Sequence, residues 1–304
     1  MDIVIVGGGP AALTASIYAS RYGVKNLVIG KAFGGEMANA HLMQNYPGYE
    51  KISGAELSQK IRDHADSYDK AELKQETVKE IVKNNKGFKV TTDSNEYEAK
   101  TVILAHGTQR RKLKIPGEEE FIGKGVSYCA TCDGPLFRNK IVGVVGGGNA
   151  AVTAAIMLTE YASKVYLIMI EKEAIAEEVW IQKMKENDKI EVIYETSVVK
   201  VDGEGLIKEI ELNKNYKESK KLSVGGLFVE IGSEPDKFFI ESLKLETGFG
   251  GKIKVTKRGE TNIPGLYAAG DVCDMFNEFA QVILAEASGA AAAYGAYNYL
   301  KTEN

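Results

Sequence analysis

Residues 2–12 are DIVIVGGGPAA, a short apolar segment rich in β-branched residues that leads into a glycine-rich turn. The residues that follow, LTASIYASRYG, have the apolar spacing of a helix. A strand, a glycine turn and a helix in this order are the context that a dinucleotide-binding fingerprint requires. Gly7 permits the tight turn, Gly9 lets the backbone approach a pyrophosphate, and Ala12 keeps the helix close to the strand. Amides at the helix N-terminus would then bind that pyrophosphate.

The same pattern occurs again in residues 141–151, where the strand IVGVV precedes the turn GGGNAA and the helical run VTAAIMLTEYA. The first copy is unspecific when taken alone, because its next strand, NLVIG, ends in Gly30 and Lys31 and not in an acid for the ribose. Two copies about a domain apart predict two dinucleotide-binding folds. The alternative is that the second copy is only a tight turn that packs a helix onto a sheet.

A third strand–helix junction lies in residues 261–272, TNIPGLYAAGDV, ahead of the helical run FAQVILAEASGAAAAYGAYNYL. Asp271 follows the end of the strand, where a carboxylate can hydrogen-bond a polyol chain. The same residues also fit an ordinary strand–helix turn. In either case, the segment indicates that the chain returns to the first domain after the second glycine turn.

These segments predict an α/β chain with two Rossmann-like nucleotide-binding domains, the second inserted in the first. Each domain is expected to have three layers in the order ββα. A length of 304 residues fits two domains. Turn residues and charges indicate linkers at residues 106–117 and 232–238. We therefore expect a first domain of residues 1–110 plus 238–304 and an inserted domain of residues 111–237.

The composition is that of a globular protein, with 44% hydrophobic and 26% charged residues. A net charge of −4 provides no basic field for nucleic acid or for an anionic membrane surface. The apolar runs are too short to span a bilayer, and the first residues show no basic segment of a signal peptide. Three cysteines do not form a secreted disulfide framework, so we expect a cytoplasmic protein.

Two of the cysteines, Cys129 and Cys132, lie in the segment SYCATCDG. A zinc site would need two more ligands, and the remaining candidates are not at ligand spacing, so we expect no metal site; these candidates are Cys273, His41, His64 and His106. The alternative is that the two cysteines are an inert buried pair. We favour a redox disulfide, because a C-x-x-C turn at a helix start lowers the pKa of a thiol and Asp133 is placed to shuttle a proton. Cys273 is expected to be a small buried hydrophobic residue.

Five segments taken together resemble the low-molecular-weight thioredoxin reductase family of flavoproteins: GGGPAA, FGGEMANAHLMQNYPG (33–48), CATCDG, GGGNAA and TNIPGLYAAGDV. The resemblance covers essentially the whole chain. It implies an FAD-binding domain from residues 1–110 and 238–304, an inserted pyridine-nucleotide-type domain that contains the disulfide, and a homodimer. It also implies that electrons pass from the flavin to the cysteine pair and then to thioredoxin.

The resemblance implies a role for individual residues as well. Cys132 matches the flavin-proximal sulfur, Cys129 the sulfur that attacks thioredoxin, and Asp133 the proton donor. Glu36 stands where the family usually has glutamine, and Ala280 where it usually has arginine. The implied FAD contacts are Gly7, Gly9, Pro10, Ala11, Ala12, Gly34, Gly35, Glu36, Asn45, Val78, Gly107, Gly270, Asp271 and Gln281.

The segment VYLIMIEKEAI, residues 165–175, departs from the family's NADPH-dependent members. Those members have His-Arg-Arg-x-x-x-Arg in line with Met169 to Ile175, and the arginines bind the 2′-phosphate. Here the arginine positions are Ile170, Glu171 and Ile175. Each lost charge-assisted contact costs roughly 1.5–3 kcal/mol, and Glu171 adds repulsion. We therefore predict that NADPH is not the electron donor.

Two other donors fit this segment. NADH fits because Glu171 lies 23 residues after Gly148, near the spacing of an acid that binds a ribose 2′-hydroxyl. The chain is also similar to the ferredoxin-dependent flavin thioredoxin reductases, in which GGGNAA would be a structural relic. Ala280 and the absent arginines fit that second alternative, which we favour. The basic residues Arg110, Arg111, Lys112 and Lys114 would face an acidic ferredoxin or form a solvated linker.

Two functions of other classes compete with a reductase. One is a non-catalytic flavin redox sensor that binds a partner, and the other is a flavin oxidase that produces peroxide. Neither function needs an acid beside a disulfide, so CATCDG disfavours both. We expect thioredoxin or a thioredoxin-like protein as the substrate.

Overall fold

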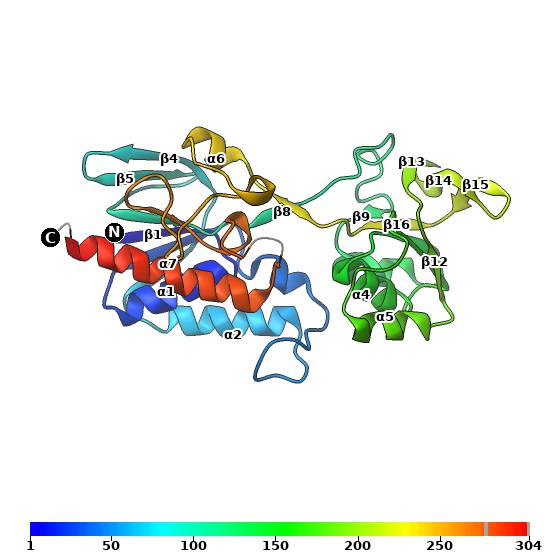
Figure 1. Cartoon of the computed structure of the whole chain (residues 1–304), viewed down its shortest axis with the longest axis horizontal. Coiled ribbons are helices and arrows are strands. Elements are labelled where there is room, and N and C mark those ends of the chain that lie inside the picture. Colours follow the sequence, from blue (N-terminus) through cyan, green and yellow to red (C-terminus); the bar gives the residue numbers. More distant parts are fainter. Residues whose placement is uncertain (277–278, 303–304) are drawn as a thin grey trace. The chain divides into compact units, whose positions relative to one another are not determined.

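The computed structural model describes residues 1–276 and 279–302. The chain forms two units (Figure 1). Unit 1 combines Met1–Gln109 with the residues from Glu234 onward, and unit 2 is Arg110–Ser233. The second unit is therefore inserted in the first.

Unit 1 is built on a five-stranded sheet in which every pair of neighbours is parallel. In spatial order its strands are β18 (Leu266–Ala268), β7 (Thr101–Leu104), β1 (Ile3–Val6), β2 (Asn26–Gly30) and β3 (Ala71–Gln75). A second, antiparallel sheet contains β4 (Val78–Asn84), β5 (Gly87–Thr92) and β6 (Glu96–Ala99). The helices are α1 (Pro10–Arg21), α2 (Gly54–Asp66), α6 (Phe238–Ser242), α7 (Val282–Thr302) and the short 3₁₀ turns η1 (Gly35–Asn39), η3 (Phe249–Gly251) and η4 (Gly270–Val272).

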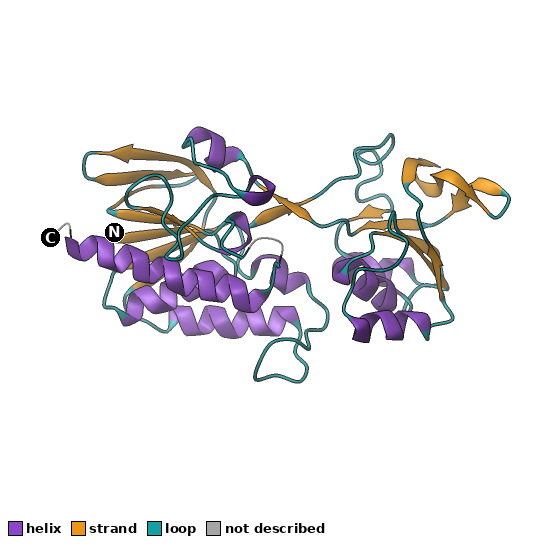
Figure 2. Cartoon of the chain, viewed as in Figure 1, coloured by secondary structure: helices purple, strands orange, loops and turns teal. Residues whose placement is uncertain are grey.

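Strand β1 shows why unit 1 has three layers. All of its residues are buried, because both faces of a parallel sheet are covered. Ile3 and Ile5 pack with the alanine-rich faces of α1 and α7, whereas Val4 and Val6 pack with the antiparallel sheet and α6. Helices α1 and α7 thus lie on one face of the main sheet, and the antiparallel strands and the short helix α6 lie on the other (Figure 2).

Unit 2 repeats this plan. Its parallel sheet has the order β12 (Ile190–Ile193), β11 (Lys164–Ile168), β10 (Ile141–Val145), β16 (Gly226–Val229) and β9 (Val126–Ser127). One face carries α4 (Asn149–Leu158) and α5 (Glu178–Lys185), and the other carries the antiparallel strands β13 (Val198–Glu204), β14 (Leu206–Tyr216) and β15 (Ser219–Ser223). The short helices α3 (Ala130–Asp133) and η2 (Gly134–Phe137) precede β10. The predicted fold class is confirmed, including the insertion.

The two stretches that connect the units are more ordered than the predicted linkers. Strands β8 (Thr108–Arg110) and β17 (Ser233–Pro235) pair with each other as a two-stranded sheet. The sequence did not predict these strands, because each has only three residues, with turn-forming or charged residues and no apolar alternation.

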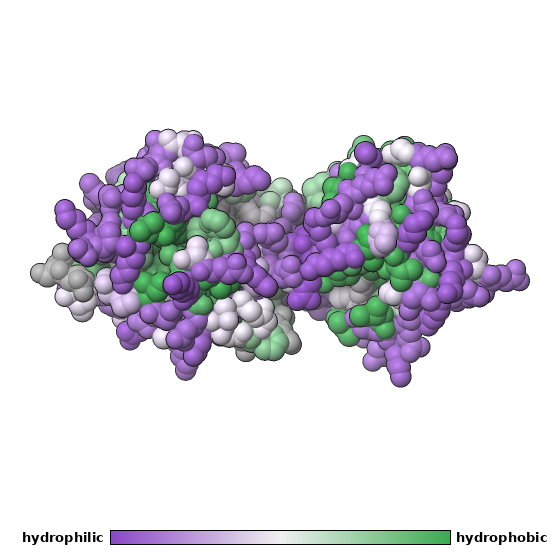
Figure 3. All heavy atoms as spheres, turned by 90° about the horizontal axis from the view of Figure 1, so that it is seen from above, coloured by the Kyte–Doolittle hydropathy of each residue, from purple (hydrophilic) through white to green (hydrophobic). Residues whose placement is uncertain are grey.

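The outer surface is mostly polar on the face seen in Figure 3, with apolar residues scattered among charged ones. Among the described residues, no helix has both the length and the apolar character needed to cross a bilayer.

Candidate functional site

The first glycine turn leaves an open space in front of α1. Gly7 has a φ of 133°, and a Cβ at this position would lie 2.1 Å from the carbonyl oxygen of Ala105. Gly9 caps α1, and the nearest described atom to a Cβ there would be the Cα of Gly35, at 3.8 Å. Pro10 begins the helix, where its missing N–H is not needed. The turn therefore exposes helix amides to any anion that enters this space.

The loop after β2 packs against this turn. The amide of Gly34 donates to the carbonyl oxygen of Gly8 at 2.7 Å. Gly34 and Gly35 have φ values of 108° and 59°, and a Cβ on Gly35 would lie 3.0 Å from the Cα of Gly9. Only glycine tolerates this approach and this backbone conformation. Gly34, Gly35 and Glu36 are thus brought beside the first turn.

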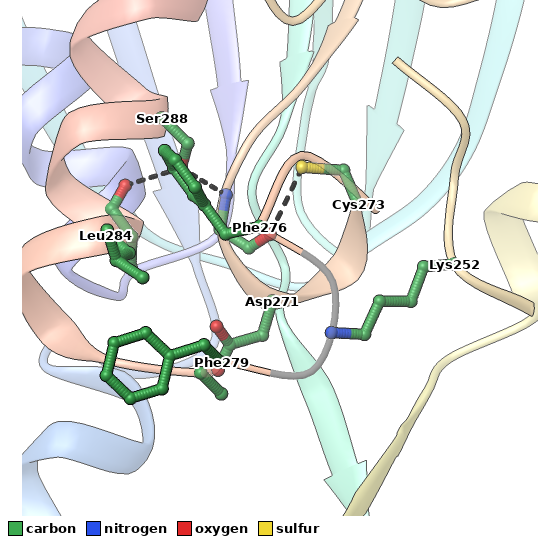
Figure 4. Close-up of a pocket in the computed structure, with 10 residues that line it drawn as sticks. Lys252, Asp271, Cys273, Phe276, Phe279, Leu284 and Ser288 are labelled. Carbon is green, nitrogen blue, oxygen red and sulfur yellow. Dashed lines mark hydrogen bonds between the residues drawn. The ribbon is translucent and has the colours of Figure 1, made fainter. Parts of the chain in front are cut away.

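Asp271 lies in η4, at the carboxyl end of β18 (Figure 4). Burial raises the pKa of its carboxyl, and the ammonium group of Lys252 opposes that effect. Gly270, with a φ of 78°, donates its N–H to Ser288 of α7 at 2.7 Å, which ties η4 to the helix. A half-shielded carboxylate at this point is suited to bind hydroxyl groups.

Cys273 lies beside Asp271 and is buried, as predicted. Its Sγ donates to the carbonyl oxygen of Gly270 at 3.2 Å (Figure 4). Burial raises the pKa of the Cys273 thiol to about 11, so it remains a protonated thiol at neutral pH. It therefore lacks the thiolate that disulfide exchange requires.

Two hydrogen-bonded pairs connect the loop around residue 45 to the start of α7. Asn45 donates to Gln281 at 3.0 Å, and the hydroxyl of Tyr46 donates to the carboxylate of Glu286 at 3.0 and 3.2 Å. Burial, followed by the charge of Glu286, raises the pKa of Tyr46 to about 12. Glu286 was missed by the sequence analysis, because nothing in its local context distinguishes it from a solvated helix residue.

The remaining predicted contacts of unit 1 lie on separate elements. Gly107 follows β7 with a φ of 72°, and no described atom lies within 4 Å of where its Cβ would be. Val78 begins β4 and is half-buried against the core. Beside Gly107, burial lowers the pKa of the imidazole of His106.

An extended dinucleotide with a polyol chain fits these features of unit 1. The open space at Gly9 and the α1 amides suit a pyrophosphate, and the carboxylate of Asp271 suits a polyol. The side-chain amides of Asn45 and Gln281 provide donors and acceptors for a heterocyclic ring.

The second glycine turn has nearly the same backbone as the first. Gly146 has a φ of 133°, equal to that of Gly7. Gly148 has φ and ψ of −88° and −178°, against −82° and −177° at Gly9. No described atom lies within 4 Å of where a Cβ on Gly148 would be. The second turn therefore retains the open geometry of a dinucleotide site.

Glu171 occupies a position beside this turn, three residues after β11 ends at Ile168. Its Oε2 lies 2.8 Å from where a Cβ on Gly147 would be, and this buried oxygen has no hydrogen-bond partner in the part of the chain that the structure describes. Ile170 and Ile175 are 69% and 67% exposed. The positions expected for a phosphate clamp thus present a carboxylate and two apolar side chains.

The disulfide joins Cys129 and Cys132 at the start of α3, with 5.3 Å between their Cα atoms. Cys132 is exposed and Cys129 is half-buried. The amide of Asp133 donates to the carbonyl oxygen of Cys129 at 3.1 Å, which places the carboxylate-bearing residue next to Cys132. Among residues 1–276 and 279–302, no group of three potential ligands is clustered tightly enough to hold a metal ion.

The basic run begins at Arg110, the last residue of β8, and two of its members form ion pairs. Arg110 forms an ion pair of 2.7 Å with the buried Glu230, and Lys112 forms one of 3.0 Å with Glu119. A buried carboxylate therefore holds Arg110, which differs from a solvated linker residue, and the docking face for an acidic protein stays a prediction. The reason is tertiary, since Glu230 is 120 residues away in sequence.

Comparison with known proteins gives a consistent result. The model of a family described as pyridine nucleotide-disulphide oxidoreductase matches residues 1–292. A thioredoxin reductase of Bacillus subtilis is 35% identical over 99% of this chain and 95% of its own length. A component of the alkyl hydroperoxide reductase of Staphylococcus aureus is 36% identical over 98% of this chain. The chain spans 59% of the length of that second relative.

Solved structures agree with these relatives. Thioredoxin reductase of Lactococcus lactis has a TM-score of 0.93 at 36% identity, with 99% of each chain covered. A ferredoxin-flavin thioredoxin reductase of Clostridium acetobutylicum has a TM-score of 0.52 at 33% identity, with 99% of this chain and 98% of that chain covered.

Proposed function

We propose that this chain, which belongs to the pyridine nucleotide-disulphide oxidoreductase family, reduces thioredoxin or a thioredoxin-like protein through FAD and the Cys129–Cys132 disulfide. The observation that carries this proposal is a disulfide at the start of α3, with Asp133 next to the exposed residue Cys132. The names of the relatives from Bacillus subtilis and Lactococcus lactis support thioredoxin as the substrate.

The cofactor is FAD, and unit 1 fits it as described above. FAD, once bound and reduced by the electron donor, would supply the two electrons that open a disulfide. The residues proposed to hold it include the glycines of the first turn, the loop at Gly34 and Gly35, and Asp271. Because Cys273 keeps its proton, we assign no redox step to it.

The reduced cysteine pair would then act by thiol–disulfide exchange. The thiolate of Cys129 attacks the disulfide of thioredoxin, which forms a mixed disulfide and releases one thioredoxin thiolate. The thiolate of Cys132 next attacks the sulfur of Cys129, which re-forms the internal disulfide and releases the second thioredoxin thiolate. Two electrons pass to thioredoxin, and Asp133 is proposed to donate a proton to a departing thiolate.

We propose that NADPH is not the electron donor. The 2′-phosphate would meet the carboxylate of Glu171 beside the second turn, and Ile170 and Ile175 offer no cationic partner. Repulsion between the 2′-phosphate and the carboxylate of Glu171 would oppose the binding of NADPH.

We propose reduced ferredoxin as the donor. The exposed, apolar Ile170 and Ile175 and the presence of Ala280 are consistent with a chain that does not bind a 2′-phosphate. A structural neighbour is a ferredoxin-flavin thioredoxin reductase. The basic run does not contribute to this proposal, because Arg110 and Lys112 are already in ion pairs.

NADH is the second candidate, and one observation favours it. Oε2 of Glu171, which has no partner among the described residues, lies beside a glycine turn whose backbone matches the first turn. A carboxylate in such a position is suited to accept a hydrogen bond from a ribose 2′-hydroxyl.

The assembly and the location of the protein are also proposals. We propose a homodimer in the cytoplasm, because the family resemblance implies a dimer and the three cysteines do not indicate an oxidising compartment.

Two anaerobic experiments test the proposed function. In the first, the protein is reduced with dithionite, freed of reductant and mixed with oxidised thioredoxin, and new thioredoxin thiols are counted. Cys129→Ser should abolish thiol formation, Cys132→Ser should stop it at the single thiol released with the mixed disulfide, and Cys273→Ser should leave it unchanged. If wild-type protein forms no thiols, the reductase proposal fails and a flavin redox sensor is favoured.

The second experiment compares donors. The loss of the oxidised flavin absorbance is followed with reduced ferredoxin, NADH or NADPH, one at a time. Rapid loss with micromolar NADPH would contradict the argument from Glu171. Loss with NADH but not with ferredoxin would replace the first donor by the second.

A further inference from the structure

Glu118 is a buried carboxylate in unit 2. It is 1% exposed, yet both of its oxygens are hydrogen-bonded. Oε1 accepts from the amide of Leu113 at 2.7 Å, and Oε2 accepts from the amide of Lys114 at 2.6 Å. These two bonds close the loop through which the chain enters unit 2, where Lys114 has a φ of 59°.

A third bond connects this loop to the redox disulfide. The hydroxyl of Tyr128 donates to Oε1 of Glu118 at 2.6 Å. Burial and the nearby carboxylate raise the pKa of Tyr128, so the phenol keeps its proton and remains the donor. Capping of the loop accounts for the two amide bonds of Glu118 but not for the bond from Tyr128.

Tyr128 immediately precedes Cys129. Ser127, the residue before Tyr128, is hydrogen-bonded to the backbone of Cys129. The amide of Cys129 donates to Oγ of Ser127 at 3.0 Å, and that hydroxyl lies 3.3 Å from the carbonyl oxygen of Cys129. Ser127 belongs to β9, a strand of the unit 2 sheet. The backbone that orients Cys129 is therefore fixed by the sheet on one side and by Glu118, through Tyr128, on the other.

We propose that Glu118 is a positioning residue that acts through Tyr128 to hold Cys129 in the orientation needed for exchange with the redoxin disulfide. This inference rests on the proposed function of the cysteine pair. Exchange requires the attacking sulfur to line up with the two sulfurs of the disulfide, so a small displacement of Cys129 slows the reaction more than it weakens partner binding.

The test removes the hydroxyl group of Tyr128 and compares the effect with removal of another tyrosine hydroxyl that bonds a glutamate elsewhere in unit 2. Tyr128→Phe deletes the bond to Glu118. Tyr216→Phe deletes an equivalent bond from Tyr216 of β14 to the carboxylate of Glu191, which does not involve the cysteine loop. Dithionite-reduced variants are mixed with oxidised thioredoxin under anaerobic conditions. We expect Tyr128→Phe to lower the single-turnover rate about tenfold with little change in the half-saturating thioredoxin concentration, and Tyr216→Phe to leave both unchanged.

A second measurement needs neither thioredoxin nor flavin turnover. In a Cys132→Ser background, the rate at which iodoacetamide alkylates Cys129 reports the environment of that sulfur. We expect addition of Tyr128→Phe to this background to change the alkylation rate several-fold. Glu118→Leu, which removes the acceptor of the Tyr128 hydroxyl, should change the rate at least as much. Tyr128→Phe should add little in the presence of Glu118→Leu, because each substitution breaks the bond between these two residues.

The outcomes separate the two proposals. If wild-type protein reduces thioredoxin while Tyr128→Phe matches it in both the exchange rate and the alkylation rate, the positioning role is wrong, even if the variant melts at a lower temperature. If Tyr216→Phe slows exchange as much as Tyr128→Phe, the effect is general destabilisation and the inference is also wrong. If wild-type protein itself reduces no thioredoxin, the proposed function fails, whereas the alkylation comparison still tests the position of Cys129.

Discussion

The side chain of Asn45 donates a hydrogen bond of 3.0 Å to the side chain of Gln281, a residue 236 positions further along the chain. One residue after Asn45, Tyr46 forms a second bond, to Glu286 on the first turns of α7. The two bonds join a surface loop to the start of a long helix in unit 1. They place both side-chain amides that we assign to the flavin side of the cofactor next to each other.

Removal of Gln281 should weaken FAD binding. We expect Gln281→Ala to raise the dissociation constant of FAD about 5- to 30-fold, which corresponds to about 1–2 kcal/mol, because Asn45 loses its partner and the cofactor loses a neighbouring amide. Titration of the apoprotein, followed by quenching of flavin fluorescence, measures this change. Gln59→Ala is a matched control, since Gln59 is bonded to Asp63 on the surface of α2. Equal effects of the two variants would contradict the assignment.

The first turn contains two glycines that should respond differently to alanine. Gly9→Ala fits the local backbone, since its φ is −82°, but the new methyl group enters the open space in front of α1. We expect the apoprotein to unfold at the wild-type temperature and to lose most of its FAD affinity. Gly7→Ala should lower the free energy of unfolding by about 3 kcal/mol, because its φ is 133° and the methyl group would meet Ala105.

Calorimetry of the apoproteins and FAD titration distinguish these two effects. Gly148→Ala is the control, because it makes the same change at the equivalent position of unit 2. Its FAD affinity should equal that of the wild type. A normal FAD affinity in Gly9→Ala would show that the pyrophosphate does not lie at this turn.

Restoring the missing cations should create NADPH dependence. The double variant Ile170→Arg/Glu171→Arg removes the repelling carboxylate and supplies two guanidinium groups. We expect the rate of flavin reduction at low NADPH concentration to rise at least about a hundredfold, since each charge-assisted contact is worth about 1.5–3 kcal/mol. Stopped-flow absorbance measures this rate of flavin reduction. Glu173→Arg is the control, because it changes only a neighbouring exposed glutamate. No difference between the two variants would mean that position 171 is not at the 2′-phosphate.

The same residue distinguishes the donors. Glu171→Gln keeps the shape of the side chain and removes its charge. If NADH is the donor, this variant should lower the rate of flavin reduction by NADH about tenfold, since a hydrogen bond to a charged group is lost. With reduced ferredoxin as the donor, the rate with ferredoxin should not change.

Glu286 should make the stability of unit 1 depend on pH. Burial raises the pKa of its carboxyl above the ordinary value of 4.5, so the folded protein binds a proton more tightly than the unfolded chain does. The resulting contribution is fully present below pH 4.5 and is lost as the pH rises through the raised pKa. Glu286→Gln should therefore gain stability relative to the wild type between pH 4.5 and neutral pH.

Urea unfolding at about pH 4 and about pH 7 measures this difference. The variant keeps an acceptor for the hydroxyl of Tyr46, so loss of that bond does not obscure the result. A difference in the free energy of unfolding that is the same at both pH values would show that the carboxyl of Glu286 does not titrate differently in the folded protein.

The local features of the fold were predictable. Gly7 and Gly146 each follow a run of β-branched residues and precede a helical pattern, and their equal φ of 133° shows that the two turns adopt one geometry. The strands at β1 and β10 followed from the same short-range signals. The resemblance also indicated which cysteines pair, and Cys273 was expected to be buried from its sequence context.

The contacts that join distant residues were not predictable. Arg110 is hydrogen-bonded to Glu230, and Asn45 to Gln281, although each pair is separated by more than a hundred residues in the sequence. Glu118 looks like a surface acid in the run GEEEF, yet it is 1% exposed and accepts three hydrogen bonds. Charged residues with no apolar periodicity around them give no signal of burial, because burial depends on which partners the fold brings near.

The glycine turns and the cysteine pair could be predicted from the amino-acid sequence, because each depends on backbone conformation or spacing within a few residues. The nested order of the two units followed from the order of the three strand–helix junctions along the chain. The position of Glu171 against the second turn and the bond between Tyr128 and Glu118 depend on the tertiary structure. Those two placements follow from the packing of segments that are separate in the chain, and packing sets the distance between charges that a sequence leaves free.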